Sequence, residues 1–423
     1  MTESINGLVD HLFRHSAGQM VATLTRVFGA EHLSLAEEVV QDALISAMQQ
    51  WALQGVPDNP RGWLFRVARN RALDQLRRQA TLRTKEPELV NAFRERASED
   101  EPLFAHELRD DQLRMMMMCC HPAIPKESRI ALTLKTVGGF SVDEIARAFL
   151  TKKEAIAQRI VRAKKLIRDE GIPMEMPSRA ELPARLDSLL EALYLLFNEG
   201  YSAHGGEDLV RTDLCYEAIR LVRQLVDHPA TSLPEAHALL GLMLMQGARL
   251  PARVDSAGEL TTLEEQDRSR WDQAMLAEGF RMFGRSAVGD RLTAYHVEAA
   301  IASCHAVARS FDETDWEAIA MHYDHLLELK PTPVVALNRA VAIAMAAGPR
   351  AGLQELESIA AHPALRDYLP LPATLGELSL RAGDRLRAAE HFARALELPS
   401  SMPEKRFLLR KLAECRNAGV SAG

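Results

Sequence analysis

The sequence has 423 residues, of which 47% are hydrophobic and 26% are charged, and its formal net charge is −7. These proportions are ordinary for globular proteins, and the length suggests about three domains. The negative net charge argues against a uniformly basic nucleic-acid coat protein, so any contact with DNA must come from local clusters of basic residues.

Targeting signals and cofactor sites are not indicated by the sequence. The N-terminal stretch lacks the basic and apolar segments of a signal peptide, and no stretch approaches the roughly 18 apolar residues of a membrane span. The five cysteines are scattered and lack the CxxC spacing of a zinc site. We therefore expect a cytoplasmic protein with no membrane partner, no disulfide framework, no metal and no other cofactor.

The first predicted elements are two helices. Residues 5–28 have apolar side chains at helical spacings, and a second helix is predicted from Leu35 to Trp51. The apolar positions of this second helix are Val39, Val40, Ala43, Ile45 and Ala47. Its acidic outer patch consists of Glu37, Glu38 and Asp42. The second helix is thus predicted to bury one side and to expose carboxylates on the other.

A loop and a basic helix follow. Residues 55–60 contain two prolines and a glycine, which cannot lie in a helix interior. From Arg61 to Lys85 there are eight basic residues and one acid, Asp74. Basic side chains neutralise phosphates and aromatic rings hold unstacked bases, so this helix, with Trp63 and Phe65, suits single-stranded or melting DNA. The alternative is that both rings are core, and we expect Trp63 to be at least partly buried.

Residues 81–104 are charged, contain two prolines and are predicted to be a flexible linker. The apolar run from Met115 to Cys120 predicts a buried helix that ends at His121 and Pro122. A metal site at Cys119, Cys120 and His121 is disfavoured, because adjacent cysteines point to different faces of a helix. A further amphipathic helix is predicted from Ser128 to Thr136, followed by a turn at residues 138–139.

Residues 141–168 have the pattern of a helix-turn-helix. Ser141 and Glu144 form a capping box that begins the first helix. The second helix has apolar residues at Ile156, Ile160, Ala163 and Ile167. Its other face is basic, with Arg159, Arg162, Lys165 and Arg168, and Lys152 and Lys153 precede it. Such a helix is what a helix-turn-helix places in the major groove of DNA. The alternative is a solvated basic face on an ordinary helical hairpin.

Residues 8–170 resemble the two conserved regions of an extracytoplasmic-function sigma factor. The stretch AEEVVQDALISAMQQW resembles the helix that docks on the RNA polymerase clamp. NPRGWLFRVARNRALDQLRR resembles the segment that melts and reads the minus-ten promoter element. GGFSVDEIARAFLTKKEAIAQRIVRAKKLI resembles the domain that reads the minus-thirty-five element, although Leu150 occupies a turn position usually held by glycine.

The resemblance implies roles for individual residues and two domains, residues 1–80 (region 2) and 105–170 (region 4). The residues implied to bind core RNA polymerase are Glu38, Gln41 and Asp42. Those implied to lie near the minus-ten strand are Arg69, Asn70, Asp74 and Arg77, with the 55–60 loop accepting an extruded base. Those implied to contact the upstream element are Lys152, Lys153, Gln158, Arg159, Arg162 and Lys165.

The C-terminal half is also predicted to be helical, so the expected fold class is all-α. Residues 171–183 contain three prolines and predict a domain boundary, followed by a helical extension over 184–289. Within it, Thr262 and Glu265 form a capping box entering a helix, and residues 199–208 form a polar connecting loop.

Residues 290–416 are predicted to form about three helical hairpins stacked as a tetratricopeptide-like solenoid, with an irregular helical bundle as the alternative. The repeat positions are Leu375, Gly376, Ala388, Phe392 and Ala395. This half resembles the long C-terminal extension of one group of extracytoplasmic-function sigma factors, which implies a role in controlling activity, through contact with the sigma domains of the same chain.

No motif of a phosphate-binding loop, zinc protease or serine hydrolase is present, so the sequence does not predict an enzyme. We expect a sigma factor whose partners are core RNA polymerase and promoter DNA. The competing hypothesis is a stand-alone helix-turn-helix regulator with a tetratricopeptide sensor domain. A scaffold that binds only protein is a weaker third hypothesis, because an acidic chain with two strongly basic segments favours a nucleic-acid partner.

Overall fold

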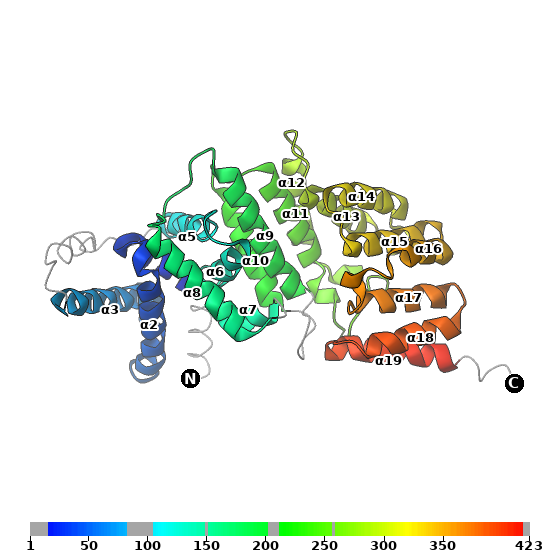
Figure 1. Cartoon of the computed structure of the whole chain (residues 1–423), viewed down its shortest axis with the longest axis horizontal. Helices are drawn as coiled ribbons and strands as arrows, with labels where there is room; N and C mark the ends of the chain where they lie inside the picture. The colour runs from blue at the N-terminus through cyan, green and yellow to red at the C-terminus, as the bar shows by residue number, and fades with distance from the viewer. Residues whose placement is uncertain (1–15, 83–104, 149–150, 202–210, 256–258, 418–423) are drawn as a thin grey trace. The chain divides into compact units, whose positions relative to one another are not determined.

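The computed structural model describes residues 16–82, 105–148, 151–201, 211–255 and 259–417. In these ranges the regular elements are helices, together with one isolated bridge between Val254 and Leu260. The predicted all-α class is therefore confirmed. The chain divides into two compact units, residues 1–193 and 194–423 (Figure 1). In the same described ranges, no helix combines the length and the apolar character that crossing a membrane requires.

Unit 1 contains both segments that resemble sigma-factor regions. Residues 16–28 are helical. The elements that follow are η1 (Ala30–His32), α2 (Leu33–Gln54), α3 (Pro60–Leu82), α5 (Ala105–Cys119), α6 (Lys126–Thr136), α7 (Val142–Ala148) and α8 (Lys153–Asp169). The predicted helices and the 55–60 loop agree with these bounds, except that α2 extends further at both ends and Pro60 opens α3.

The run from Met115 to Cys120 forms the most completely buried stretch of unit 1, as predicted, with every side chain fully buried. The two cysteines are free thiols, and burial raises the pKa of Cys120 to about 11. They therefore act as small apolar side chains in the core.

The boundary between the units lies inside α9 (Leu182–Tyr201), whereas the sequence predicts it at residues 171–183. The first half of α9 packs on unit 1, where Arg185 donates from Nη1 to the carbonyl oxygen of Met117 at 3.2 Å. Glu191 of the same helix lies 3.0 Å from Lys126. The three prolines do mark an irregular segment, but the helix that follows it is shared between the two units.

Unit 2 begins with the rest of α9 and continues through α10 (Thr212–Asp227), α11 (Pro234–Gly247) and α12 (Gln273–Ser286). Half of the predicted capping box is formed: the backbone N–H and the hydroxyl of Thr262 donate to Glu265 at 3.0 and 2.8 Å, whereas the N–H of Glu265 donates to the backbone carbonyl oxygen of Thr262 at 3.0 Å. It closes a turn rather than beginning a helix, so that part of the prediction is wrong. The next α-helix, α12, begins after Asp272, whose carboxylate accepts from the N–H of Met275. Glu199 is buried inside α9 rather than in a polar loop, and residues 202–210 lie outside the described residues.

The last part of unit 2 is a series of helices in which each packs on the next. They are α13 (Ala294–Val307), α14 (Trp316–Leu329), α15 (Pro333–Ala347), α16 (Pro349–Ile359), α17 (Pro370–Arg381), α18 (Arg385–Leu396) and α19 (Met402–Asn417), coloured yellow to red in Figure 1. Gly376 of α17 lies against the ring of Phe392, where a Cβ atom would come within 2.8 Å of the ring. Packing between neighbours along the chain is what a solenoid requires, and the tetratricopeptide-like assignment stays a prediction.

A partly buried arginine joins η3 (Arg268–Arg270), which precedes α12, to the end of α13. Arg268 donates from Nη1 to the carbonyl oxygens of His305 and Ala308, both at 2.6 Å, and its guanidinium lies 4.8 Å from the ring centre of Trp271. Burial first, and then the charges of Arg249 and Arg268, lower the pKa of His305 to about 3. His305 is therefore neutral in the folded protein.

This histidine predicts a pH dependence of stability. Its pKa in the folded chain lies below its ordinary value of 6.5, so the unfolded chain binds a proton that the folded chain does not, and stability falls as the pH decreases below 6.5. We expect the wild-type thermal midpoint to drop between pH 7.5 and 5.5 by more than that of His305→Phe. Calorimetry at both pH values measures the difference, and equal drops would contradict the expectation.

Candidate protein-binding and DNA-binding surfaces

One face of α2 exposes a stripe of mixed polar and apolar side chains. Glu38 and Gln41 are exposed, and the residues that continue the same face at helical spacing are Ile45 and Met48, which are 54% and 43% exposed. We call these four residues the α2 stripe. The opposite face is buried through Val39, Val40, Ala43 and Ala47. The prediction that Ile45 belongs to the apolar side of α2 is therefore wrong, and its exposure is a signal that sequence reasoning missed.

The other two acids of α2 have local partners. Asp42 is partly exposed and lies 3.7 Å from Arg71 of α3, which also donates to the hydroxyl of Ser46 at 2.7 Å. Glu37 is turned inward with only 14% of its side chain exposed. It accepts from the hydroxyl of Thr136 at 3.0 Å and pairs with Lys164 of α8. The predicted outer acidic patch therefore loses Glu37, while Glu38 and Asp42 stay accessible.

The start of α3 fixes the loop that precedes it. Asn59 caps the helix by accepting from the N–H of Gly62 at 2.9 Å, and Pro60 occupies the first helical position. Trp63 is partly buried and packs edge-to-face on the buried Trp51, with 5.4 Å between ring centres. The expectation that Trp63 is partly core is confirmed.

The outward face of α3 carries the residues implied to lie near the minus-ten strand. Asn70 and Asp74 are exposed one turn apart, and Arg77 is half-buried with a hydrogen bond of 3.2 Å to Asp74. Arg69 is half-buried. Arg66 is exposed one turn before Asn70 and extends the same face, although it is absent from the predicted set; its spacing of four residues from Asn70 is the signal that could have identified it.

The helix-turn-helix residues fold as predicted in the described part. The N–H and the hydroxyl of Ser141 donate to Glu144 at 2.8 and 2.7 Å, and the N–H of Glu144 donates back to the hydroxyl, which completes the capping box. The four apolar positions of α8, namely Ile156, Ile160, Ala163 and Ile167, are all buried. Phe149 and Leu150, which precede the turn residue Thr151, lie outside the described residues.

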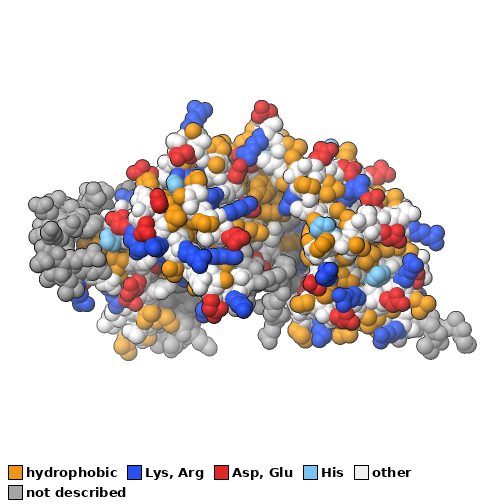
Figure 2. Space-filling view, in the orientation of Figure 1, with side chains coloured by type: hydrophobic (Ala, Val, Ile, Leu, Met, Phe, Trp, Pro, Cys, Tyr) orange, Lys and Arg blue, Asp and Glu red, His pale blue; other side chains and the backbone are white. Residues whose placement is uncertain are grey.

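The solvent face of α8 presents most of the predicted DNA-binding side chains (Figure 2). The exposed members are Lys152, Lys153, Gln158, Arg162 and Lys165. Arg159 is partly buried and pairs with Glu127 of α6 at 2.8 Å, and Lys153 pairs with Asp143 of α7 at 2.8 Å. Val161 is 64% exposed beside Arg162, and sequence reasoning missed it. Among the described residues Arg162 forms neither a hydrogen bond nor an ion pair, which leaves its guanidinium free for a ligand.

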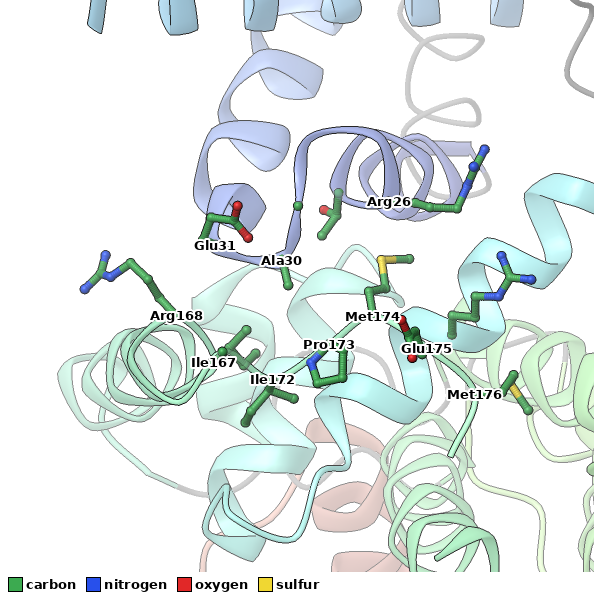
Figure 3. A pocket seen from close by; sticks show the side chains of 14 residues that line it. Arg26, Ala30, Glu31, Ile167, Arg168, Ile172, Pro173, Met174, Glu175 and Met176 are labelled. Carbon is green, nitrogen blue, oxygen red and sulfur yellow. The ribbon is translucent and has the colours of Figure 1, made fainter. Parts of the chain in front are cut away.

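A cavity of about 660 Å³ lies where the helix of residues 16–28 and η1 meet α5 and the end of α8 (Figure 3). Its apolar lining includes Ile167, Ile172 and Met174. Arg26 and Arg114 line it from opposite elements, and both bind the buried carboxylate of Asp111, at 2.8 and 3.3 Å. The cavity is therefore part of the contact between the N-terminal helices and the helix-turn-helix.

Known protein families match both N-terminal segments of the chain and part of its C-terminal half. The family model described as Sigma-70 region 2 matches residues 12–81, and the model described as Sigma-70, region 4 matches residues 114–167. A family of unknown function, DUF6596, matches residues 185–287. The ECF RNA polymerase sigma factor SigE of Mycolicibacterium smegmatis is 27% identical over 161 residues, which are 38% of this chain and 60% of SigE. No solved structure matches.

These matches support an ECF-like sigma factor over the N-terminal regions of the chain. A second relative is similar over nearly the whole chain: Uncharacterized protein R00370 of Rhizobium meliloti is 39% identical over 409 residues, 96% of this chain and 95% of that protein. The chain belongs to the same family as this rhizobial protein. The resemblance to a sigma factor is thus confirmed for the N-terminal regions, and the matches do not test the tetratricopeptide-like prediction for residues 290–416.

Proposed function

We propose that the chain binds core RNA polymerase in the cytoplasm and directs it to promoters that carry a minus-ten and a minus-thirty-five element. The observation that supports this most strongly is the separation of three surfaces in unit 1. The α2 stripe, the outward face of α3 and the solvent face of α8 each expose a different set of side chains. A stand-alone repressor or activator needs only the last of these.

The α2 stripe is the proposed contact with core polymerase. Ile45 and Met48 expose apolar surface next to Glu38 and Gln41 on the same face of α2, and exposed apolar groups beside polar ones are typical of protein interfaces. Asp42 lies at the edge of the stripe, where Arg71 holds it in place. The partner surface should therefore offer basic groups around an apolar centre.

The solvent face of α8 is the proposed reader of the upstream element. Gln158 and Arg162 have the side chains that pair with adenine and guanine in the major groove, and the exposed Val161 could contact a thymine methyl group. Lys152, Lys153 and Lys165 are suited to phosphates. Arg159, which is paired with Glu127, would have to exchange that partner for DNA.

The outward face of α3 is the proposed minus-ten contact. Asn70 and Asp74 offer amide and carboxylate groups to unstacked bases, while Arg66, Arg69 and Arg77 supply positive charge near the strand. The capped loop at residues 55–59 lies directly before this helix, which is compatible with its accepting an extruded base.

The C-terminal half is proposed to regulate the sigma regions of the same chain. The proposed division is a helical extension at residues 184–289 and a tetratricopeptide-like solenoid at 290–416. The solenoid is supported by the succession of packed helices from α13 to α19 and by the burial of Ala388, Phe392 and Ala395. An intramolecular contact between this half and the sigma regions is part of the proposal.

Binding to core polymerase tests the proposed function. The purified chain is titrated with core RNA polymerase that lacks a sigma subunit, and complex formation is followed by fluorescence anisotropy. Saturable binding in competition with another sigma factor is the expected result. Absence of binding, together with binding to duplex DNA by the chain alone, would instead support a stand-alone regulator.

The variant Arg162→Ala tests the proposed contact between α8 and the upstream promoter element. We expect binding to the upstream element to weaken by roughly 5- to 150-fold, because one good base contact contributes about 1–3 kcal/mol. Arg168→Ala is the matched control, since Arg168 belongs to the same helix but lines the cavity of Figure 3. Electrophoretic mobility shifts on specific and unrelated duplexes measure both variants. An equal loss on all duplexes would mean that Arg162 contacts phosphate and not bases.

A further inference from the structure

We propose that Tyr201, Arg249 and Arg253 of unit 2 form a binding site for one oxyanion group, a phosphate or a carboxylate, of a small diffusible ligand. We call these three residues the arginine–tyrosine site. The inference goes beyond the proposed function, because it concerns a ligand of the C-terminal half and not polymerase or promoter DNA. It can therefore be tested without either of them.

The ends of two helices bring the three side chains together. Tyr201 is the last residue of α9, and Arg249 comes shortly after the end of α11. The short η2 (Leu250–Ala252) then turns the chain, since the N–H of Ala252 donates to the carbonyl oxygen of Arg249 at 2.9 Å. Arg253 follows this turn directly, and its guanidinium carbon lies 3.9 Å from the centre of the Tyr201 ring. The site thus combines two segments that are far apart in the sequence.

Aromatic rings hold both guanidinium groups in place. Arg253 lies over the ring of Tyr201, and the guanidinium carbon of Arg249 lies 5.5 Å from the ring centre of Trp271. A guanidinium that faces a ring keeps its N–H donors in its own plane, where they point away from the ring. These donors match the oxygens of a phosphate or a carboxylate, often two at a time. The rings therefore fix the two cations while leaving donors for an oxyanion.

The positive charge of the site has no carboxylate partner in the described part of the chain. Neither Arg249 nor Arg253 forms an ion pair there. Arg249 donates from Nε to the side-chain oxygen of Gln266 at 3.4 Å, and its two terminal nitrogens have no hydrogen-bond partner among the same residues. Burial lowers the pKa of Arg249; Tyr201 opposes this shift, and the charge of Arg253 adds to it. Two neighbouring cations that are partly buried and unpaired are unfavourable, which indicates an anionic partner from outside the chain.

A structural arginine in the same region looks different. Arg268, which also lies beside Trp271, donates to the carbonyl oxygens of His305 and Ala308, both at 2.6 Å. Its donors are thus used to join two segments of the fold. Arg249 and Arg253 have no such bonds to backbone oxygens in the described ranges. Holding the fold together therefore accounts for Arg268 but leaves the other two arginines unexplained.

Two neutral donors accompany the arginines. Burial raises the pKa of the Tyr201 hydroxyl, but the charges of Arg249 and Arg253 outweigh burial, and the pKa is lowered from its ordinary value. Both arginines thus act on the same hydroxyl group. Trp271 is only 3% exposed, and its indole N–H has no hydrogen-bond partner among the described residues. A region rich in donors and poor in acceptors suits an anion.

The burial of the site favours a small ligand over a nucleic acid. DNA backbones are bound by exposed basic side chains spread over a surface, as on the solvent face of α8. Arg249 and Arg253 are partly buried and converge on one hydroxyl, so they suit a single anionic group. A few placed polar groups among aromatic rings are typical of small-molecule sites.

Calorimetric titration of the full chain tests the inference. The protein is titrated with sodium phosphate, and separately with sodium malonate, with the ionic strength held constant by chloride. We expect saturable binding of at least one of the two probes. Preference for phosphate assigns a phosphate group to the natural ligand, and preference for malonate assigns a carboxylate. Absence of saturable binding by both probes would overturn the inference.

Three variants locate the binding. Arg253→Gln should weaken the affinity for the preferred probe by roughly tenfold or more, because charge-assisted hydrogen bonds are the strong ones. Tyr201→Phe keeps the ring below Arg253 and removes only the hydroxyl, so it tests the site even if Arg253→Gln fails to fold; a loss of about threefold or more is expected. The control is Arg270→Gln, which removes an exposed arginine of η3 with the same change in charge and should bind like the wild type.

The contradicting outcomes are distinct. Equal losses in Arg253→Gln and Arg270→Gln would mean a general effect of charge, and unchanged binding in both Arg253→Gln and Tyr201→Phe would place the anion elsewhere. Either result would overturn the site. Binding of the folded Arg253→Gln variant to duplex DNA should match the wild type. A clear loss there would assign these arginines to nucleic acid and overturn the small-ligand proposal.

Discussion

Replacing Ile45 with aspartate is expected to weaken binding to core RNA polymerase by about 100-fold without changing the fold. The side chain is 54% exposed in the free chain, so the substitution removes little buried apolar area. At the centre of an interface, however, a new carboxylate would be desolvated without a partner, and losses of 2 kcal/mol or more, about 30-fold or greater, are typical of central positions. Anisotropy titration of core polymerase measures the change.

The matched control for this variant is Leu386→Asp. Leu386 lies on α18 of unit 2 and is 82% exposed, so it tests the same loss of an exposed aliphatic side chain outside the α2 stripe. The control should bind core polymerase like the wild type. A loss of less than threefold for Ile45→Asp, with the circular dichroism spectrum unchanged, would remove the α2 stripe from the polymerase interface.

Phe392→Ala is expected to cost about 3–5 kcal/mol of stability, the range for a fully buried ring. Phe392 is fully buried in a cluster with Ala388, Leu408 and Leu412, and its ring fills the space that Gly376 leaves open. In a solenoid each helix contacts mainly its neighbours, so the damage should stay local. Hydrogen exchange should therefore accelerate in α17–α19 (residues 370–417) far more than in α10 and α11.

The control for this prediction is Leu386→Ala on the same helix, which removes an exposed side chain and should leave exchange unchanged. Uniform acceleration over the whole of unit 2 would argue for a single cooperative bundle rather than a stack of hairpins. That outcome would favour the irregular-bundle alternative for residues 290–416.

The sequence predicts features that depend on local patterns. The apolar period of α8 correctly identifies Ile156, Ile160, Ala163 and Ile167 as buried, and the capping box at Ser141 is formed. The continuous apolar run from Met115 to Cys120 likewise predicts full burial. In each case the backbone periodicity and the side-chain chemistry of a few neighbouring residues determine the outcome.

Features that depend on distant residues could not be predicted. The sequence gives Glu37 the pattern of an exposed acid, whereas its contacts with Thr136 and Lys164, about 100 or more positions away, accompany an exposure of only 14%. Ile45 fits an apolar pattern, yet it is 54% exposed among the described residues of unit 1. The first half of α9 packs on unit 1, where Arg185 donates to the carbonyl oxygen of Met117, and the prolines before the helix do not indicate this contact.

The central claim is that this chain confers promoter specificity on core RNA polymerase, and reconstituted transcription tests it most directly. The full chain is mixed with core enzyme free of any sigma subunit and with genomic DNA, and the 5′ ends of the transcripts are sequenced. The account predicts discrete start sites that share an upstream pair of elements, with weaker initiation for Arg162→Ala and almost none for Ile45→Asp. No initiation above core enzyme alone, by a folded chain that binds duplex DNA unaided, would contradict it.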